Sequence, residues 1–576
     1  MKSNSKKWAG LAGIAAVALA LSACAPATNG GNEGDGGSSP EALPATGWVA
    51  ADRDAIKDGG TLNLPLDETP ANWNLYNLDA GTVDDNTISS LFTPGFVVIN
   101  EDGGWEADPN FATSVELKSE DPQVVEVKVN PDAVWSDGTP IGVQDFQGQF
   151  NALNGKTEAY APTSTNVWSD VASVEAGEND QDVLITFANK NADWPSILGT
   201  GTIYPRWLTA TPESFNTAWA NGPFAADGST YVSGGPFIVS KFDATGKTIT
   251  FEPNPKWWGD KPKLDTINYK ATDRSTVGQA FANKEFDAIP INSSVDTLES
   301  AKARSDSEIL NSKGVTYSHV TLNGTAGVFE DVAVRQAFAK SLDRQIMAQA
   351  VIEPLGVEPE VLNNLIFLNG QNGYEDDGAD IAFDVDAAKK QLEDAGWVEG
   401  DKGIREKDGT KLTVRLVIPS ETPNSAILSQ QIQPMAAKAG FDVKIDTVPS
   451  ADFFTKYITT ETRDFEATIF AWQGTPFPIS STESIFSPAD SGQNFPGVAD
   501  ERLDGLWTKA NAELDPEARL EIAKEIDKII MSEAVTIPLA ARPNQYAIAD
   551  GLVNYGPSQF ESTTGTNFWQ NVGWAK

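Results

Sequence analysis

The sequence predicts an α/β protein built from at least two lobes. The chain has 576 residues, more than one hydrophobic core usually organises. Strand-like and helix-like patterns alternate between about residues 410 and 540, which is typical of an α/β lobe. Hydrophobic residues make up 40% of the chain, with 16 tryptophans, so large packed cores are possible. A single cysteine excludes a disulfide within the chain, and packing must therefore stabilise the fold.

The first residues form an export signal. Three lysines among the first seven residues precede an apolar run at residues 11–21, which is too short to remain as a membrane-spanning helix. The run ends in Leu21-Ser22-Ala23-Cys24, which resembles the bacterial lipobox. That resemblance implies removal of residues 1–23 and acylation of Cys24. The alternative is an ordinary signal peptide with an incidental cysteine.

Residues 24–54 are predicted to be a flexible tether, because Gly, Ser, Pro, Asn and Ala dominate residues 25–45. No later apolar run has membrane-spanning length, so the lipid would be the only membrane attachment. The formal charge is −39, and loss of the three leader lysines makes it −42. Such an acidic surface repels phosphate backbones, which argues against a nucleic-acid partner.

Strands and a turn are expected in the first half of the body. Alternating apolar residues predict strands at residues 60–64, 124–129, 234–240 and 248–251. A tight turn is expected at Asp137-Gly138, with Trp135 packed against its flank. For Trp257 and Trp258, packing over a loop is a better interpretation than stacking on a ligand.

Helices are expected in the second half. Apolar residues recur every four positions and predict one helix with a single apolar stripe, formed by Val334, Phe338, Leu342 and Ile346. Asp384 is expected to cap a following helix that ends at Gly396. Asp515-Pro516 is expected to open a long helix.

The residue types exclude most catalytic chemistry. His319 is the only histidine, and no other His or Cys stands near it, so a strand histidine with a satisfied ring is favoured over a metal ligand or a base. No nucleophile elbow, phosphate-binding loop or dinucleotide motif is found, and no cofactor is expected. The acidic run at 375–380 misses the EF-hand spacing and is expected to be a solvated loop. A secreted glycosidase, which needs only two carboxylates and aromatic platforms, remains permitted.

Six motifs occur in order over roughly residues 55–555. They are Val134-Trp135-Ser136-Asp137-Gly138-Thr139-Pro140, Gly235-Pro236-Phe237, Asn254-Pro255-Lys256-Trp257-Trp258-Gly259, Lys284-Glu285-Phe286-Asp287-Ala288, the stretch from Asp331 to Arg344, and the stretch from Asp386 to Trp397. Together they resemble the extracytoplasmic solute-binding proteins of ABC importers, family 5, which includes the dipeptide- and oligopeptide-binding proteins.

The resemblance implies a two-lobed periplasmic-binding-protein-like fold with a hinge and an additional inserted subdomain. Lobe one would comprise residues 55–95, 231–315 and 545–576, the inserted subdomain 96–230, and lobe two 316–544. The chain would cross between the lobes near residues 317–323 and 539–546. Solute would bind in the cleft and pass to a membrane permease driven by an ATPase. The receptor would act as a monomer on the outer face of the cytoplasmic membrane.

The expected ligand site departs from the family pattern. Many peptide binders hold the ligand amine with an aspartate after an aromatic strand end, but Gln473, Gly474 and Thr475 stand at the matching place. The ligand is therefore a peptide held otherwise, or an oligosaccharide stacked on Trp472 and Phe477. Whether Trp472 lines the pocket or packs in the core stays open. On the opposite lobe, the expected site residues are Asn72, Trp73 and Asn74.

The leading hypothesis is a non-enzymatic receptor for peptides. Within the same class, a receptor for an oligosaccharide or another small solute is the alternative, and the lone histidine argues against nickel. From a different class, the alternative is a secreted glycan-active enzyme with two cleft carboxylates. A degenerate family member with a regulatory role in the envelope would have a blocked cleft.

Overall fold

A computed structural model describes residues 43–199, 201–560 and 568–576. The export signal, Cys24 and most of the expected tether lie outside the described residues. The described part is one compact unit of mixed α/β structure. None of its helices is long and apolar enough to cross a membrane.

The first sheet confirms three of the expected strands. Its strand order is β1-β10-β9-β8, and the strands are β1 (Thr61–Leu66), β8 (Phe237–Asp243), β9 (Thr248–Pro253) and β10 (Thr266–Ala271). β1 runs parallel to β10, and the other neighbours are antiparallel. Successive side chains of a strand point to opposite faces, so Leu62 and Leu64 of β1 are buried in one cluster with Phe251 and Ile267.

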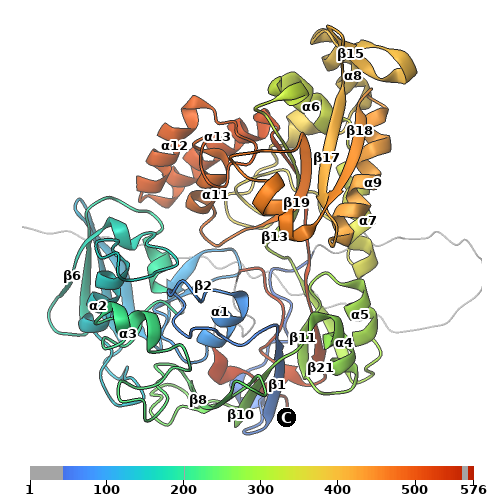
Figure 1. Cartoon of the computed structure of the whole chain (residues 1–576). Helices are drawn as coiled ribbons and strands as arrows, with labels where there is room; N and C mark the ends of the chain where they lie inside the picture. Colours follow the sequence, from blue (N-terminus) through green and yellow to red (C-terminus); the bar gives the residue numbers. More distant parts are fainter. Residues whose placement is uncertain (1–42, 200, 561–567) are drawn as a thin grey trace, which may run out of the picture. The chain divides into compact units, whose positions relative to one another are not determined.

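A second, smaller sheet has the order β11-β21-β12. Its strands are β11 (Ala288–Pro290), β12 (Ser307–Ser312) and β21 (Asn544–Ala549). Helices α4 (Arg274–Ala282) and α5 (Val295–Ala301) pack on each other, and α4 contacts β11 (Figure 1). Helix α1 (Val83–Ser89) follows β1, and the short pair β22 (Leu552–Val553) and β23 (Gly573–Trp574) lies near the end of the chain.

A four-stranded antiparallel sheet forms within residues 112–187, in the order β4-β5-β7-β6. The elements of this region are β2 (Val97–Ile99), β3 (Trp105–Ala107), β4 (Ala112–Glu120), β5 (Gln123–Val129), α2 (Val143–Leu153), β6 (Val171–Ala176), β7 (Asp182–Phe187) and α3 (Pro212–Thr217). Trp135 is buried in its core, and Gly138 has a φ of +90° in the adjoining turn, as expected. Trp257 and Trp258 pack on Phe111, which confirms their structural interpretation.

The largest sheet has five strands in the order β18-β17-β19-β13-β20. They are β13 (Thr316–Leu322), β17 (Thr413–Pro419), β18 (Asp442–Val448), β19 (Ala467–Gln473) and β20 (Thr536–Ala541). β17 runs parallel to β18 and β19, whereas β13 is antiparallel to β19 and β20. The alternation of strands and helices expected between residues 410 and 540 is therefore confirmed.

Helices cover this sheet, and α9 packs on β17 and β18 (Figure 1). The helices are α6 (Val332–Lys340), α7 (Arg344–Ile352), α8 (Val385–Asp394), α9 (Pro423–Ala437), α10 (Ser450–Asp452), α11 (Pro478–Phe486), α12 (Glu501–Ala512) and α13 (Pro516–Glu533). A short sheet adds β14 (Val398–Glu399), β15 (Arg405–Lys407) and β16 (Thr410–Lys411). The expected caps are present, because Asp384 accepts from the Ala387 amide and Asp515 from the Ala518 amide.

The apolar stripe expected along one helix is divided between two. α6 ends at Lys340, and α7 begins at Arg344 after the Asp343 side chain caps it by accepting from the Ile346 amide. A spacing of four residues drifts by about 40° per step around a helix with 3.6 residues per turn. The stripe therefore could not have stayed on one face, and Ile346 is 46% exposed.

The chain passes twice between the β11-β21-β12 sheet and the five-stranded sheet, and we call these passages the crossing segments. Residues 313–315 join β12 to β13, and residues 542–543 join β20 to β21. The first precedes the range 317–323 expected from the sequence, which forms β13 instead. The Arg542 amide donates to the Thr316 carbonyl at 2.8 Å. A Cβ on Gly314 would lie 2.1 Å from the Arg542 carbonyl oxygen, so only glycine allows this approach.

Candidate ligand-binding site

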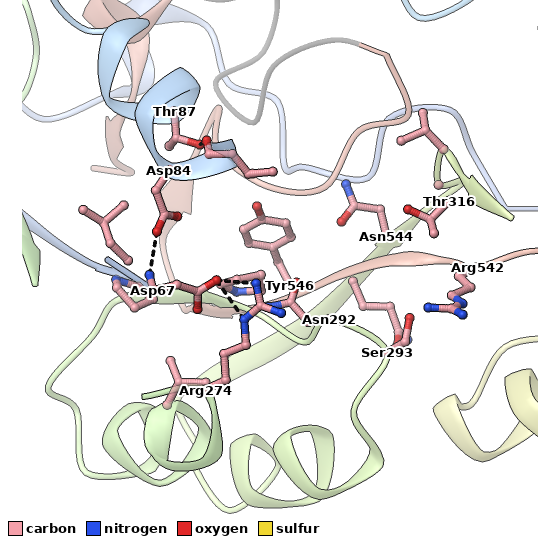
Figure 2. A pocket seen from close by; sticks show the side chains of 18 of the residues that line it. Asp67, Asp84, Thr87, Arg274, Asn292, Ser293, Thr316, Arg542, Asn544 and Tyr546 are labelled. Atoms are coloured by element: carbon pink, nitrogen blue, oxygen red, sulfur yellow. Dashed lines mark hydrogen bonds and ion pairs between the residues drawn. The ribbon is translucent and has the colours of Figure 1, made fainter. Parts of the chain in front are cut away.

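A cavity with a volume of about 550 Å³ lies at the crossing segments. We call it the first cavity. Its lining comes from β1, α1, β10, α4, β21, both crossing segments and the end of β19. Its volume is in the range of about 300–1,000 Å³ that small-molecule sites occupy. The polar lining residues include Asp67, Asp84, Thr87, Arg274, Asn292, Ser293, Thr316, Gln473, Arg542, Asn544, Gln545 and Tyr546, most of which Figure 2 labels.

One end of the first cavity is acidic. Asp84, in the first turn of α1, accepts hydrogen bonds from the amides of Asp67 at 2.8 Å and Glu68 at 2.9 Å. Burial raises the pKa of Asp84, and the neighbouring carboxylates of Asp67 and Asp85 raise it further, while the two amide bonds oppose this shift. Asp67 forms an ion pair with Arg274, whose Nε donates to it at 2.8 Å. Two carboxylates and one guanidinium therefore gather at this end.

The opposite end holds Arg542, in the second crossing segment (Figure 2). Its Nε and Nη2 donate to the Ser318 hydroxyl at 3.3 and 3.1 Å. No carboxylate of the described residues forms an ion pair with it, and burial lowers its pKa. Thr316 and Gln473 are register partners on β13 and β19 and line the cavity beside it. Thr316 begins β13, Gln473 ends β19 and Arg542 follows β20, so a cation and two neutral polar groups lie at one end of these neighbouring strands.

Buried tyrosines lie between the two ends. Burial raises the pKa of Tyr546 to about 12 and that of Tyr269 well above its usual value, so both phenols are neutral at physiological pH. Tyr269 lines the cavity, and its buried hydroxyl has no hydrogen-bond partner among the described residues. An unpaired buried hydroxyl is costly, and the surrounding fold bears this cost beside the cavity.

Backbone strain also occurs in the lining. Asn292 and Ser293 are consecutive and have φ values of +52° and +56°, in the left-handed region that non-glycine residues rarely adopt. Such conformations cost about 1–3 kcal/mol each and gather at ligand sites. Both residues line the first cavity.

Four of the residues predicted from the sequence line a second cavity of about 220 Å³. They are Trp472, Gln473, Gly474 and Thr475. Gln473 lines both cavities, and the opposite wall of the second cavity is residues 364–368. The alternatives for Trp472 are both realised, because its half-buried ring lines this cavity and stacks on Phe495 with centroids 5.9 Å apart.

Phe477 lines a third cavity of about 210 Å³ rather than the first two. Its neighbours there are Pro476 and Pro478, and the facing wall includes Trp105 and residues 192–195. An ion pair between Arg519 and Asp193, 2.5 Å apart, closes one side. Phe477 is therefore placed in an apolar contact region away from the crossing segments.

Asn72, Trp73 and Asn74 are buried and have structural roles. The side-chain Nδ2 of Asn72 donates to the Asn216 carbonyl and that of Asn74 to the Phe215 carbonyl, both at 3.0 Å. Trp73 packs on Phe92 with centroids 5.9 Å apart. None of the three lines the cavities described above. The expectation that they face the ligand therefore has no support, because their polar atoms are used to hold residues 215–216.

The sequence interpretation missed Arg542, Asp84 and Tyr269. Two signals were available: Asp67-Glu68 directly follows the first strand, and Arg542-Pro543 separates two strands. Neither signal indicates that Arg542, Asp84 and Tyr269 line the same cavity. In the described part of the chain, no group of three or more His, Cys, Asp or Glu side chains could hold a metal ion.

Comparisons with known proteins agree with this architecture. The family model described as bacterial extracellular solute-binding proteins, family 5, matches residues 106–493. A protein of Mycobacterium tuberculosis named oligopeptide-binding protein OppA is 33% identical over 503 residues, covering 87% of this chain and 83% of the relative.

Two solved structures show the same fold. A periplasmic EDTA-binding protein, EppA, has a TM-score of 0.80 at 22% identity and covers 94% of this chain and 100% of its own. The oligopeptide-binding protein AppA of Bacillus subtilis, in complex with a nonapeptide, has a TM-score of 0.68 at 19% identity and covers 90% of this chain and 100% of its own. The resemblance and the fold class expected from the sequence are thereby confirmed.

Proposed function

Because this chain belongs to the bacterial extracellular solute-binding proteins of family 5, the solute receptors of ABC importers, we propose that it captures peptides in the first cavity. In this proposal the receptor then delivers the peptide to a membrane permease whose ATPase drives import. The family consists of binding proteins, and the glycan-active enzyme considered from the sequence is set aside.

The chemistry of the first cavity is the observation that supports a peptide ligand. It has acidic groups at one end, an unpaired arginine at the other, and neutral Asn, Gln and Tyr side chains between them. A peptide has a charged amine, a charged carboxylate and intervening amides that need hydrogen bonds when buried. Gln473, Gly474 and Thr475 would then contact the ligand from the second cavity, in place of the family aspartate.

We expect bound peptides to co-purify with the protein when it is isolated from its native host under mild conditions. Mass spectrometry of the small molecules released on denaturation should identify peptides. Addition of matching synthetic peptides to stripped protein should raise the melting temperature, since a ligand at 100 times its Kd adds about 2.7 kcal/mol to the free energy of unfolding. Released glycans, with a thermal shift from oligosaccharides and none from peptides, would replace the peptide assignment with the sugar receptor.

We further propose that Cys24 is acylated and holds the receptor, as a monomer, on the outer face of the cytoplasmic membrane. The lipobox at residues 21–24 and the composition of residues 25–45 support this. The full-length chain should sediment with membranes and enter the detergent phase, whereas Cys24→Ala should not. Equal partitioning of both forms would overturn the anchor without affecting the ligand assignment.

A further inference from the structure

We propose that Arg542 binds the carboxylate of the solute, so that the ligand lies in the first cavity with its carboxylate at the crossing segments and its amine toward Asp84. The inference rests on the proposed receptor function and names the chemical class of ligand: a short solute that has a free carboxylate. Arg542 and Asp84 both lie outside the stretch 472–475, where the sequence places the expected ligand site.

The position of Arg542 is fixed by the fold. It directly follows β20, and its amide donates to the Thr316 carbonyl of the neighbouring strand at 2.8 Å. The Ser318 hydroxyl accepts from its Nε and Nη2. These bonds hold Arg542 at the cavity, which its side chain lines (Figure 2).

Comparison with other arginines shows why Arg542 is incomplete without a ligand. Arg344 and Arg463 also lack a carboxylate partner among the described residues, but each donates to three or more acceptor oxygens of the protein. Arg274 and Arg519 are paired with aspartates. Within the described part of the chain, Arg542 has a single neutral hydroxyl as its side-chain acceptor. A poorly solvated cation with so few partners is costly.

The opposite end of the cavity complements this cation. Asp84 keeps a carboxylate beside the Asp67–Arg274 pair, and the sign of this end is therefore negative. Figure 2 shows Asp84 and Arg542 on opposite sides of the cavity, with Tyr546 between them. A zwitterionic ligand is attracted in one orientation and repelled in the other.

The test compares free-acid and C-terminally amidated forms of one synthetic tripeptide library, by isothermal titration and thermal shift. Wild-type protein should bind the acids about 10–100-fold more tightly than the amides, because hydrogen bonds to charged groups are the strong ones. The Arg542→Gln variant should bind the free-acid peptides more weakly by this factor, and it should bind acids and amides equally. Lys313→Gln is the matched control, since it removes a cation from the other crossing segment without touching the cavity.

Each outcome decides between the two proposals. If the wild type binds acids and amides equally, the carboxylate anchor is wrong while the peptide receptor stands. Fe(III)-EDTA is a second probe, because it carries carboxylates but is not a peptide. If no peptide binds but Fe(III)-EDTA does, and Arg542→Gln abolishes that binding, the carboxylate-binding role of Arg542 stands and the peptide assignment is wrong. If neither probe binds, both proposals fail. The acid-to-amide ratio is measured on the wild type and does not depend on folding of the variant.

Discussion

Replacing Asp527 with leucine is expected to lower the free energy of unfolding by about 1–3 kcal/mol. Asp527 lies on α13 and is fully buried. Its Oδ1 accepts from the amides of Leu365 at 2.8 Å and Ile366 at 3.3 Å. Leucine has a similar volume but no acceptor, so the Leu365 amide loses its partner, which costs about 1–3 kcal/mol, whereas the Ile366 amide still donates to Asn364 Oδ1 at 3.0 Å. Urea unfolding of both proteins measures the difference.

This substitution should also weaken ligand binding, because Leu365 and Ile366 form part of the wall of the second cavity. Glu525→Gln is the matched control: Glu525 is exposed on the same helix, two residues away, and its replacement should change stability by less than about 0.5 kcal/mol. Equal unfolding curves for Asp527→Leu and Glu525→Gln would contradict a structural role for the Asp527 carboxylate.

Asparagine at position 527 separates the hydrogen bonds from the charge. Burial, and then the nearby carboxyl of Asp377, raises the pKa of Asp527 well above its usual value. The folded state thus holds a proton that the unfolded state releases above a pH of about 4. The stabilisation from this group is complete below that pH and is lost as the pH rises through the folded pKa. Asp527→Asn should therefore become more stable than the wild type as the pH rises.

Acidification below pH 6.5 is expected to destabilise the fold through His319, by up to about 1.4 kcal/mol for each pH unit. His319 is fully buried in β13, and burial, followed by the charge of Arg542, lowers its pKa to about 3. The unfolded chain binds a proton near pH 6.5 and the folded chain does not. The stabilisation is thus present above pH 6.5 and is lost as the pH falls toward 3.

His319 is the only histidine, so its imidazole resonance is unambiguous in NMR spectra. The resonance should not titrate between pH 8 and pH 5 in the folded protein. The slope of stability against pH should be shallower in His319→Gln, and taking the difference between variant and wild type cancels the opposite contribution of Asp527. A resonance that titrates near pH 6.5 would show that the ring is solvated.

His319 also refines the sequence expectation of a satisfied strand histidine. Its Nδ1 lies 3.0 Å from the Thr321 hydroxyl, but its Nε2 has no hydrogen-bond partner among the described residues. The ring packs instead on Phe470 and lies parallel to Trp472. The strand-like residues around it indicated its place in a strand, whereas the surroundings of the second ring nitrogen depend on residues far along the chain.

Features that depend only on residues close in sequence, such as helix caps, could be predicted from the sequence. Asp384 and Asp515 cap helices because a cap needs only the next few amides. The break at Asp343 is equally local, yet the stripe through Leu342 concealed it. The acidic run at 375–380 is more than a solvated loop, because Glu375 pairs with Lys524 and Lys528 of α13. That pairing joins segments about 150 residues apart.

The sequence by itself determined the α/β class and the family, and it singled out the stretch at 472–475, which lines the second cavity. Each of these depends on contiguous residues or on an ordered set of short motifs. Only the tertiary structure decided which charges meet. Asp67 neutralises Arg274 and Asp193 neutralises Arg519, while no carboxylate of residues 43–199, 201–560 and 568–576 pairs with Arg542. Charge pairing acts over a few ångströms in space, and sequence order does not record that distance.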